Sequence, residues 1–453
     1  MGAGKPFLIA KLAFIFVILL VMMIPLSMIR GQIEDRERTR DSAIGEISHK
    51  WGAPQAVNGP MLAVPFTRVK MVESSRVISG RNGREETVIE RKPAVEIDTA
   101  YFLPETLAVS GRLNPQIRYR GIFEAVLFSA GLEMRGTFAP PDFGKLQIPE
   151  KDVRWKDAEV ILGIADSHGV RENIVMKWDG VLCSFSPSAM PPLWGGGGVI
   201  GVRVPVSASN SGHAFSINLN LNGSGELTLA PFGKETHVEL AADWPSPSFS
   251  GAYLPSKRDV TAKSFSASWD IFYLARRFPQ QWTGANVSAA DFSAALFGVK
   301  LITPANSYQK TLRSTKYGLL CISLTFMVFF MFEIFNVKSV HPVQYLLVSL
   351  ALCLFYMLLL STSEFLGFGP AYLIASVATV AVIAGYSRAV LGGGSRAVVM
   401  GGGLALLYGY FYILLQLEDY ALLMGSVGLF AVLAGIMYFT RRVDWYASDK
   451  TLS

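Results

Sequence analysis

The stretch LAFIFVILLVMMIPLSMI, which covers residues 12–29, decides the fold of this chain. It is apolar almost throughout, and at about 1.5 Å per helical residue it can cross a hydrocarbon core of roughly 30 Å. A long polar and strand-like region follows, and the last third of the chain then carries five further apolar segments. This distribution predicts a membrane protein with one large domain outside the membrane.

The five later segments predict membrane spans at about 317–335, 343–361, 370–386, 397–415 and 421–440. The expected fold is therefore an N-terminal transmembrane helix, a large mainly antiparallel β domain of the sandwich type, and a C-terminal bundle of five transmembrane helices, six in total. The expected domains are the N-terminus with the first helix at 1–30, the β-rich domain at 31–312, the later helices at 313–441 and a tail at 442–453.

The composition agrees with a membrane location, because 51% of the residues are hydrophobic, only 17% are charged and the mean hydropathy is +0.35. The net charge of +6 is not arranged as a basic stripe with interleaved aromatic residues, so no nucleic-acid partner is expected. Scattered basic residues are common beside anionic lipid, which makes membrane lipids the expected partners. Cys183, Cys321 and Cys353 lack the spacing of a disulfide framework or a metal site.

The first apolar segment could also be a cleaved secretory signal, with Lys5 and Lys11 as its positively charged region. Its apolar run is longer than a normal signal core, and the sequence SMIRGQ at 27–32 lacks a clear small-x-small cleavage site. An uncleaved signal anchor is therefore the better interpretation.

The Lys and Arg residues of the short loops predict the orientation of the spans. Basic residues stand in one set of loops, at 338, 388, 396, 441 and 442, whereas the alternate loops hold acids at 364, 418 and 419 and no Lys or Arg. This pattern predicts both termini in the cytoplasm and the large domain on the outer side of the membrane. Arg30, Arg36, Arg38 and Arg40 follow the first span and conflict with it, but three concordant loops outweigh them.

Alternation of apolar and polar residues dominates the region between the first and second spans. Residues 215–222, FSINLNLN, predict a strand with one buried and one wet face. Similar strands are predicted at 61–69, 94–102, 122–128, 199–206 and 265–269, and an amphipathic helical stalk at 35–51. The proline and glycine clusters at 187–198 predict loops, so the domain could be one unit or two subdomains divided there.

Patterns typical of catalysis are not found in the sequence. Asp166, Ser167 and His168 are adjacent, and adjacent residues of a strand or turn cannot form a charge relay by adjacency alone. The five histidines lack metal-ligand spacing, and the glycine runs lack the lysine and hydroxyl of a phosphate-binding loop. The sequence therefore predicts no enzyme activity, no cofactor and no metal.

Glu333 is an acid in an otherwise apolar span. A carboxylate at membrane depth costs several kcal/mol unless it is paired, protonated or near water. Two interpretations stay open: the head of Glu333 reaches the cytoplasmic interface or pairs with Lys338, or it has a buried functional role. His341 and Gln344 could also meet this carboxylate across the short turn.

Several motifs together are highly specific: GPMLAVP at 59–65, LPE at 103–105, RYRGI at 118–122, DWPSPSF at 243–249, TKY at 315–317, HPVQYLL at 341–347 and DWY at 444–446. By these motifs the chain resembles the CreD inner-membrane proteins, which are also described as cell-envelope-integrity or colicin-tolerance proteins. The resemblance runs from the first span to the tail. It implies a Gram-negative inner-membrane protein linked to envelope integrity and stress response, and it implies no established reaction or catalytic residue.

The DWPSPSF motif has two interpretations. A rigid proline-flanked turn at Pro245 could present Trp244 and Phe249 to a partner or to lipid headgroups, or the same side chains could close the end of a sandwich. Arg120, in the RYRGI motif, is a further candidate interaction residue.

The leading functional hypothesis is a non-enzymatic protein that supports the envelope through contacts of its periplasmic β domain with lipids or envelope proteins. An insertase-like or lipid-transport-like device is the alternative, and it rests on the architecture alone.

Overall fold

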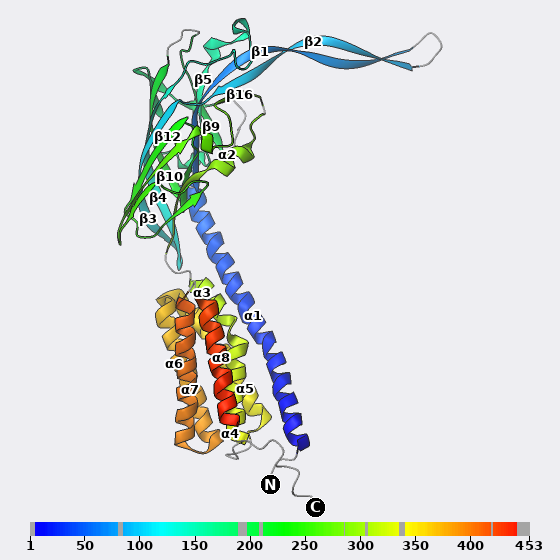
Figure 1. The fold of residues 1–453 in the computed structure, drawn as a ribbon, viewed down its shortest axis with the longest axis vertical. Coiled ribbons are helices and arrows are strands. Elements are labelled where there is room, and N and C mark those ends of the chain that lie inside the picture. The colour runs from blue at the N-terminus through cyan, green and yellow to red at the C-terminus, as the bar shows by residue number, and fades with distance from the viewer. Residues whose placement is uncertain are drawn as a thin grey trace, which may run out of the picture. The chain divides into compact units, whose positions relative to one another are not determined.

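The computed structural model describes the chain except for residues 1–4, 80–84, 189–196, 208–211, 285, 304–306, 335–339, 418–419 and 442–453. The chain divides into two compact units. The first, here the helical unit, is Met1–Ser42 with Ala305–Ser453, and the second, the β unit, is Ala43–Pro304. Figure 1 shows the helices and strands of the two units, and the helix α1, Lys5–Trp51, contributes residues to both.

The helical unit contains α1 and the helices that follow the β unit in the chain: α3 Ser307–Thr315, α4 Gly318–Ile334, α5 Pro342–Leu366, α6 Phe368–Leu391, α7 Gly394–Gln416 and α8 Ala421–Thr440. Within the described residues, α1, α5, α6 and α7 are long and apolar enough to cross a membrane, and α3 with α4, which meet at a bend of 45°, could form a fifth span. The part of α8 that qualifies as apolar, Leu422–Tyr438, is shorter. Four or five candidate spans therefore stand, and the sixth stays a prediction.

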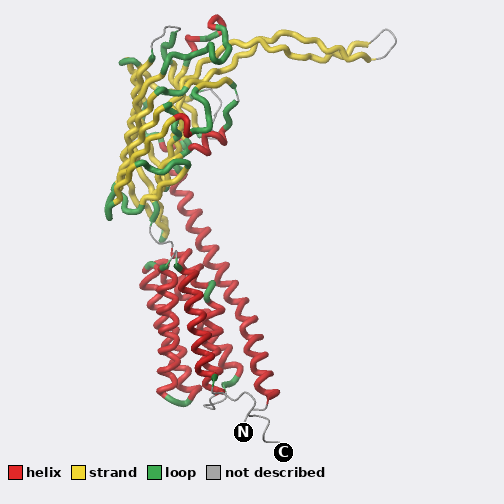
Figure 2. Tube along the Cα trace, viewed as in Figure 1, coloured by secondary structure: helices red, strands yellow, loops and turns green. Residues whose placement is uncertain are grey.

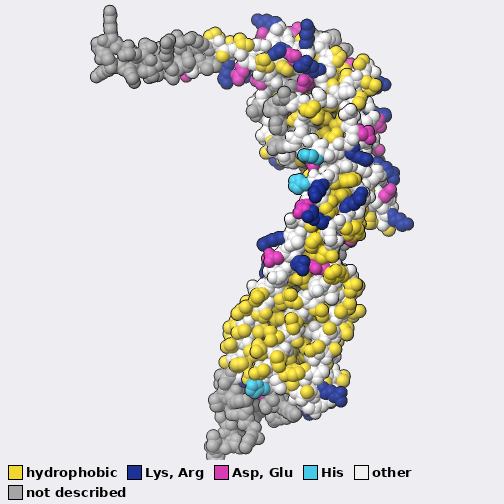
Figure 3. All heavy atoms as spheres, turned by 180° about the vertical axis from the view of Figure 1, so that it is seen from behind, with side chains coloured by type: hydrophobic (Ala, Val, Ile, Leu, Met, Phe, Trp, Pro, Cys, Tyr) yellow, Lys and Arg dark blue, Asp and Glu magenta, His cyan; other side chains and the backbone are white. Residues whose placement is uncertain are grey.

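Large apolar side chains cover the surface of the helical unit, as Figure 3 shows. Phe16, Leu373 and Leu422 are 61%, 65% and 87% exposed. Soluble proteins rarely expose so much contiguous apolar surface, whereas lipid tails solvate it. The surface of this unit therefore fits a bilayer.

The β unit contains two sheets, drawn as strands in Figure 2. The first has the order β13-β17-β11-β1-β5-β9-β8, with β2 paired to β1 and β16 to β2. Its strands are β1 Gln55–Ser79, β2 Glu85–Phe102, β5 Glu159–Ile164, β8 Ser186–Pro187, β9 Gly198–Arg203, β11 Glu226–Leu229, β13 Pro247–Gly251, β16 Gln281–Thr283 and β17 Phe297–Leu301. A short helix, α2 Ala289–Ala295, begins at a capping box formed by Ser288 and Asp291.

The second sheet has the order β14-β15-β12-β3-β4-β10-β6-β7. Its strands are β3 Thr106–Arg120, β4 Phe123–Phe138, β6 Val175–Trp178, β7 Val181–Ser184, β10 His213–Ser224, β12 Glu235–Ala242, β14 Lys257–Val260 and β15 Phe265–Phe272. Antiparallel pairing prevails, but β1 with β11 and β3 with β12 are parallel. The large β domain is therefore mixed, and it is mainly antiparallel as the sequence predicted.

One hydrophobic core joins the two sheets, because Leu62 and Val160 of the first sheet belong to the same buried cluster as Val109 and Leu219 of the second. In β10, Phe215, Ile217, Leu219 and Leu221 are buried, which confirms the face predicted from their alternation. A single core and a single compact unit favour one domain over two subdomains.

Candidate functional site

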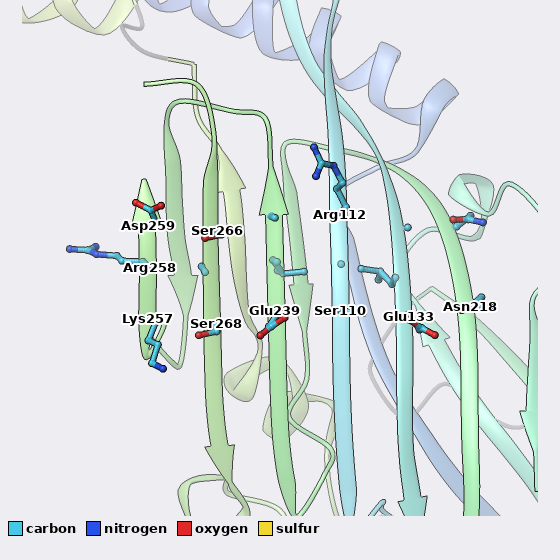
Figure 4. Close-up of a pocket in the computed structure, with 17 residues that line it drawn as sticks. Ser110, Arg112, Glu133, Asn218, Glu239, Lys257, Arg258, Asp259, Ser266 and Ser268 are labelled. Atoms are coloured by element: carbon cyan, nitrogen blue, oxygen red, sulfur yellow. The ribbon is translucent and has the colours of Figure 1, made fainter. Parts of the chain in front are cut away.

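Two rows of side chains cross the outer face of the second sheet, as Figure 4 shows. The register aligns one residue from each of six adjacent strands in each row. The first row is Lys257, Ser268, Glu239, Ser110, Glu133 and Asn218, and the second is Asp259, Ser266, Ala241, Arg112, Gly131 and Asn220. Successive side chains of a strand point to opposite faces, so the neighbours Val109, Leu132 and Leu240 lie in the core instead.

These rows line an open groove of about 930 Å³, which we call the sheet groove. Small residues such as Ser110, Gly131 and Ser266 leave room between the longer side chains of the two rows. Hydroxyl groups stand on β15 and β3 and amide groups on β10. The lining carries as many basic as acidic side chains: Arg112, Lys257 and Arg258 against Glu133, Glu239 and Asp259.

The charged residues differ in how they are compensated. Arg112 Nη2 lies 3.0 Å from Asp243 Oδ2, and Glu133 accepts from Arg135 Nε at 2.7 Å. By contrast, the three charged residues of the edge strand β14, at 257–259, make no ion pair with any described residue. The β14 end of the groove therefore presents charges without an ion pair to a described residue, the middle presents paired charges, and the β10 end presents neutral amide groups.

His237 lies beside the groove. It is two residues before Glu239 in β12, so the two side chains share a face of the sheet. Its Nδ1 is 2.7 Å from Asp270 Oδ1 and its Nε2 is 3.2 Å from Glu239 Oε1. The hydrogen bond to Asp270 raises the pKa of His237, burial acts against this, and Glu239 adds to the rise. The imidazolium form is thereby favoured next to the groove.

The groove presents both polar and apolar atoms. Its donors and acceptors stand on neighbouring strands of one sheet, and its lining is less apolar than that of a usual small-molecule pocket. Among the described residues no group of three His, Cys, Asp or Glu side chains lies close enough together to hold a metal ion. The lining therefore combines hydrogen-bonding groups with charges of both signs.

The structure pairs Glu333 of α4 with Lys11 of α1, and the side chains of the two residues are 14% and 6% exposed. Lys11 Nζ also donates to the backbone oxygen of Val340 at 2.7 Å and lies 5.9 Å from the centre of the Tyr345 ring. Pairing offsets the cost of burying both charges. Lys338, the partner considered from the sequence, lies outside the described residues.

His341 and Gln344 form the N-terminal cap of α5. His341 Nδ1 accepts from the backbone N–H of Val343 at 3.3 Å, and Gln344 Oε1 accepts from the backbone N–H of His341 at 2.9 Å. A capping box satisfies N–H groups that a helix start otherwise leaves unpaired. These contacts give both residues a structural role, and no hydrogen bond joins either to Glu333 within the described region.

Trp244 belongs to the core of the β unit, with 9% of its surface exposed, and its Nε1 donates to the backbone oxygen of Ile302 at 3.0 Å. Phe249 makes edge-to-face contacts with Phe265 and Trp269, at centroid distances of 5.9 and 5.8 Å. Pro245 is exposed between them. These contacts favour the interpretation in which the motif closes the end of the sandwich.

Arg120 ends β3 and forms an ion pair with Glu46, within the part of α1 that belongs to the β unit. Nearby, the guanidinium of Arg118 lies 5.6 Å from the ring centre of Trp51, whose Nε1 donates to Phe128 O at 3.2 Å. Arg120 therefore fastens the β3–β4 hairpin to the end of α1.

Sequence reasoning missed the sheet groove and the role of Lys11. Asn218 and Asn220 were recognised as the wet face of a strand, but their neighbours across the sheet follow from a register that no local pattern encodes. Lys11 was noted only as a basic residue before an apolar run, although a lone acid in an apolar span is itself a signal that a buried cation lies elsewhere in the chain.

Comparison with known proteins agrees with this architecture. The family model described as Inner membrane protein CreD matches residues 7–446. The Inner membrane protein CreD of Escherichia coli (strain K12) is 33% identical over 440 residues, which cover 96% of this chain and 93% of that protein. Several apolar helices, a large β domain and these matches define a multi-span inner-membrane protein. The chain belongs to the CreD family.

A solved structure similar to part of the chain is the M1 zinc metallopeptidase from Deinococcus radiodurans. It is 10% identical, with a TM-score of 0.21, and the match covers 44% of this chain and 41% of that chain. A score this low carries no argument about fold or activity.

Proposed function

We propose that this CreD-family protein holds its β unit in the periplasm, with both termini in the cytoplasm, and supports the cell envelope by binding an envelope component there without catalysing a reaction. The observation that carries the binding role is the sheet groove, whose polar groups stand in register across six strands. Envelope stress response and colicin tolerance are the cellular roles proposed for this binding.

Two ion pairs of the helical unit fit a membrane span of α1, in either orientation. Lys11 pairs with Glu333, and Arg36 Nε lies 3.7 Å from Glu364 Oε1, a carboxylate that also accepts from Tyr308. Lys11 and Arg36 are separated by about 37 Å along α1 at roughly 1.5 Å per residue. This distance matches a hydrocarbon core of about 30 Å plus part of the headgroup layers.

Two of the basic residues that follow the first span, Arg36 and Arg40, are paired with acidic side chains. Glu364 belongs to a loop expected on the periplasmic side, and its pairing with Arg36 puts a compensating charge beside one of the arginines that oppose the orientation. Arg40 is also compensated, by Asp41 at 2.7 Å. Acidic partners on the same side of the membrane partly offset the cost of placing Arg36 and Arg40 on the periplasmic side.

The groups around the sheet groove favour binding over catalysis. Arg112, Glu133 and Glu239 are engaged by neighbouring charged side chains, so none is poised as an isolated acid or base. A rigid sheet presenting paired charges and hydroxyl groups resembles the rim of a protein interface, where polar contacts fix orientation.

A second candidate function, lipid handling by the helical unit, is favoured by an apolar groove of about 840 Å³ between α6 and α7. Ala405 and Gly409 leave it open on α7, and Tyr372 and Ser376 line it on α6. Small residues of this kind allow close approach of an acyl chain as well as of a helix. An insertase-like or lipid-transport-like device would use such a lateral groove.

The proposal is tested by filling the sheet groove. Ser110→Trp and Ser268→Trp place an indole among the two rows, and Asn114→Trp, on the same face of β3 but outside the groove lining, is the matched control. We expect the groove variants to reach normal abundance in the host membrane yet to behave like a deletion strain in growth with SDS and EDTA and in survival of colicin. The Asn114 control should behave like the unsubstituted protein.

Full protection by both groove variants would contradict a binding role for this face. Gly409→Leu, which fills the apolar groove between α6 and α7, separates the two candidate functions. Loss of protection in this variant alone, at normal abundance, would favour lipid handling instead.

A further inference from the structure

A long two-stranded ribbon extends from the first sheet, as Figures 1 and 2 show. β1 and β2 pair without interruption from Leu62 with Phe102 to Ser79 with Glu85. On the other side of β1 the pairing with β5 ends at Ala63, and on the other side of β2 the pairing with β16 ends at Ala100. The ribbon therefore continues for about 50 Å, at roughly 3.4 Å per residue, after the pairing with its flanking strands has ended.

One face of the ribbon is apolar and exposed. Val69 pairs with Val95, Met71 with Pro93, and Thr67 with Ile97, so these side chains share a face. Val69, Met71, Val95 and Ile97 are 64%, 59%, 71% and 58% exposed. Burial of such side chains stabilises by about 25 cal/mol per Å² of apolar area, so leaving four of them uncovered in water forgoes a large favourable term.

The opposite face is polar and internally compensated. Lys70 Nζ lies 3.8 Å from Glu96 Oε2, and Arg68 Nη1 lies 4.0 Å from Asp98 Oδ2. The two faces of this stretch therefore differ sharply: ion pairs stand on one and aliphatic side chains on the other.

The edges of the ribbon are open as well. Gly284 N–H donates to Thr99 O at 3.3 Å, and among the described residues this is the last backbone hydrogen bond from the β16 side. On the other edge of the ribbon, Arg154 N–H donates to Pro65 O, and Phe66 forms an isolated bridge with Val153. Beyond Phe66, β2 is the strand that pairs with β1 among the described residues, and the opposite edge of β1 is open. Isolated two-stranded ribbons are marginally stable, and a long exposed edge is a ready template for another strand.

We propose that the ribbon is a docking arm for an extended segment of another envelope protein, which adds as a strand to the free edge of β2 and covers Val95 and Ile97. Such a strand would lie along the same edge of β2 that pairs with β16. Its backbone N–H and C=O groups would pair with those of β2, which the first sheet holds in an extended conformation. Its apolar side chains cover the exposed face, because alternate residues of an added strand fall on that face. This inference rests on the proposed binding function of the β unit and names a kind of partner for it.

A lipid surface fits this face less well. Surfaces that bind membranes combine apolar residues with an excess of Lys and Arg and with interfacial Trp or Tyr. Here the two basic residues are matched by two acids, and the described apolar face carries aliphatic side chains and no aromatic ring. The described part of the ribbon has balanced charges, an open backbone edge and an aliphatic face. This combination matches an added protein strand.

The test is photocrosslinking in living cells with the full-length protein in its own membrane. Benzoylphenylalanine replaces Val95 on the apolar face or, as the matched control, Glu96 on the opposite face of the same strand. We expect a discrete protein adduct from position 95 that maps to one segment of an envelope protein, and at least fivefold less from position 96. Val69→Ser with Ile97→Ser should remove the adduct at unchanged abundance.

A second measurement tests strand addition itself. A synthetic peptide with the sequence of the crosslinked segment, added to the full chain in nanodiscs, should slow hydrogen exchange of the β2 amides at 94–99. Adducts to lipid, adducts to a second copy of this chain, equal adducts from both positions, no adduct, or unchanged exchange would each overturn the docking arm. Loss of envelope protection in the Ser110→Trp variant is independent of all these results, so failure of the arm and failure of the proposed function are distinguishable.

Discussion

Removal of one member of the Lys11–Glu333 pair should destabilise the helical unit strongly. The side chains of Lys11 and Glu333 are 6% and 14% exposed, and Lys11 is held further by Val340 O. Glu333→Gln leaves a buried ammonium group without its counter-charge, and Lys11→Met leaves a buried carboxylate. In either variant the remaining buried charge has no counter-charge, and its desolvation penalty is no longer offset by the ion pair.

The magnitude follows from burial. Breaking a buried ion pair by removing one partner costs about 3–5 kcal/mol in proteins, and a single charge near the middle of a membrane helix costs about 2.5–3.5 kcal/mol by insertion measurements. Because Glu333 lies at the end of α4, we expect each single variant to lose about 3 kcal/mol. The double variant Lys11→Met with Glu333→Met should lose no more than either single one, which gives a coupling free energy of about 3 kcal/mol.

The assay is unfolding of the full chain by SDS in mixed micelles, followed by the loss of helical circular dichroism. Glu34→Gln is the matched control, because it removes the exposed pair of Arg30 with Glu34 from α1, where the two side chains are 56% and 38% exposed. That control should lose less than about 0.5 kcal/mol. The reasoning is refuted if Glu333→Gln loses no more than Glu34→Gln, or if the two single losses simply add.

Three further changes test the β unit by urea unfolding followed through tryptophan fluorescence. Trp244→Ala should cost about 3–5 kcal/mol because it empties a core position, and a loss below 1 kcal/mol would argue for a surface role. Arg276→Met should cost about 3 kcal/mol, because this buried guanidinium, whose pKa burial lowers to about 10, donates to Phe232 O and neighbouring carbonyls that would lose their partner; an unchanged midpoint would refute this. His237→Gln should flatten the pH dependence of stability: the raised pKa means that the contribution of His237 is full below about pH 6.5 and falls as pH rises through the folded value, and it should stay under about 1 kcal/mol because the side chain is half exposed. A variant with the same pH profile as the unsubstituted protein would contradict the assignment.

The spans were the most predictable part of the fold, because hydropathy is a local property. The segment expected at 343–361 lies within α5, Pro342–Leu366, and the one at 397–415 within α7, Gly394–Gln416. The expected stalk at 35–51 is the continuation of α1 rather than a separate element. Helix lengths beyond the apolar core depend on capping and packing, so the boundaries moved outward.

Strands were predictable only where alternation is uninterrupted. β10 fulfils this condition, whereas β3 contains Gly111 and the pair Asn114-Pro115, which locally predict a loop. Gly111 lies on the core side, where a Cβ would lie 2.6 Å from Cδ2 of Leu132 and of Leu240, so a larger residue there would force these side chains to shift. Pairing across long sequence distances, as in the parallel β3 with β12, cannot be read from either strand alone.

The candidate sites also differ in how far the sequence predicts them. Glu333 stands out in the sequence by its surroundings, but its partner Lys11 lies 322 residues away in the chain. The sheet groove has no sequence signature, because each strand contributes a few polar or charged residues that look like any solvated face.

The proposed function requires that the β unit lie on the periplasmic side of the inner membrane. A membrane-impermeant maleimide applied to intact spheroplasts tests this with Lys257→Cys, on the exposed edge strand of the groove, and Ser395→Cys, in the turn that begins α7, each in a Cys183→Ser background. We predict that the Lys257→Cys variant is labelled before lysis and the Ser395→Cys variant only after it. Labelling of the Lys257→Cys variant only after lysis would place the groove in the cytoplasm and contradict the proposed function.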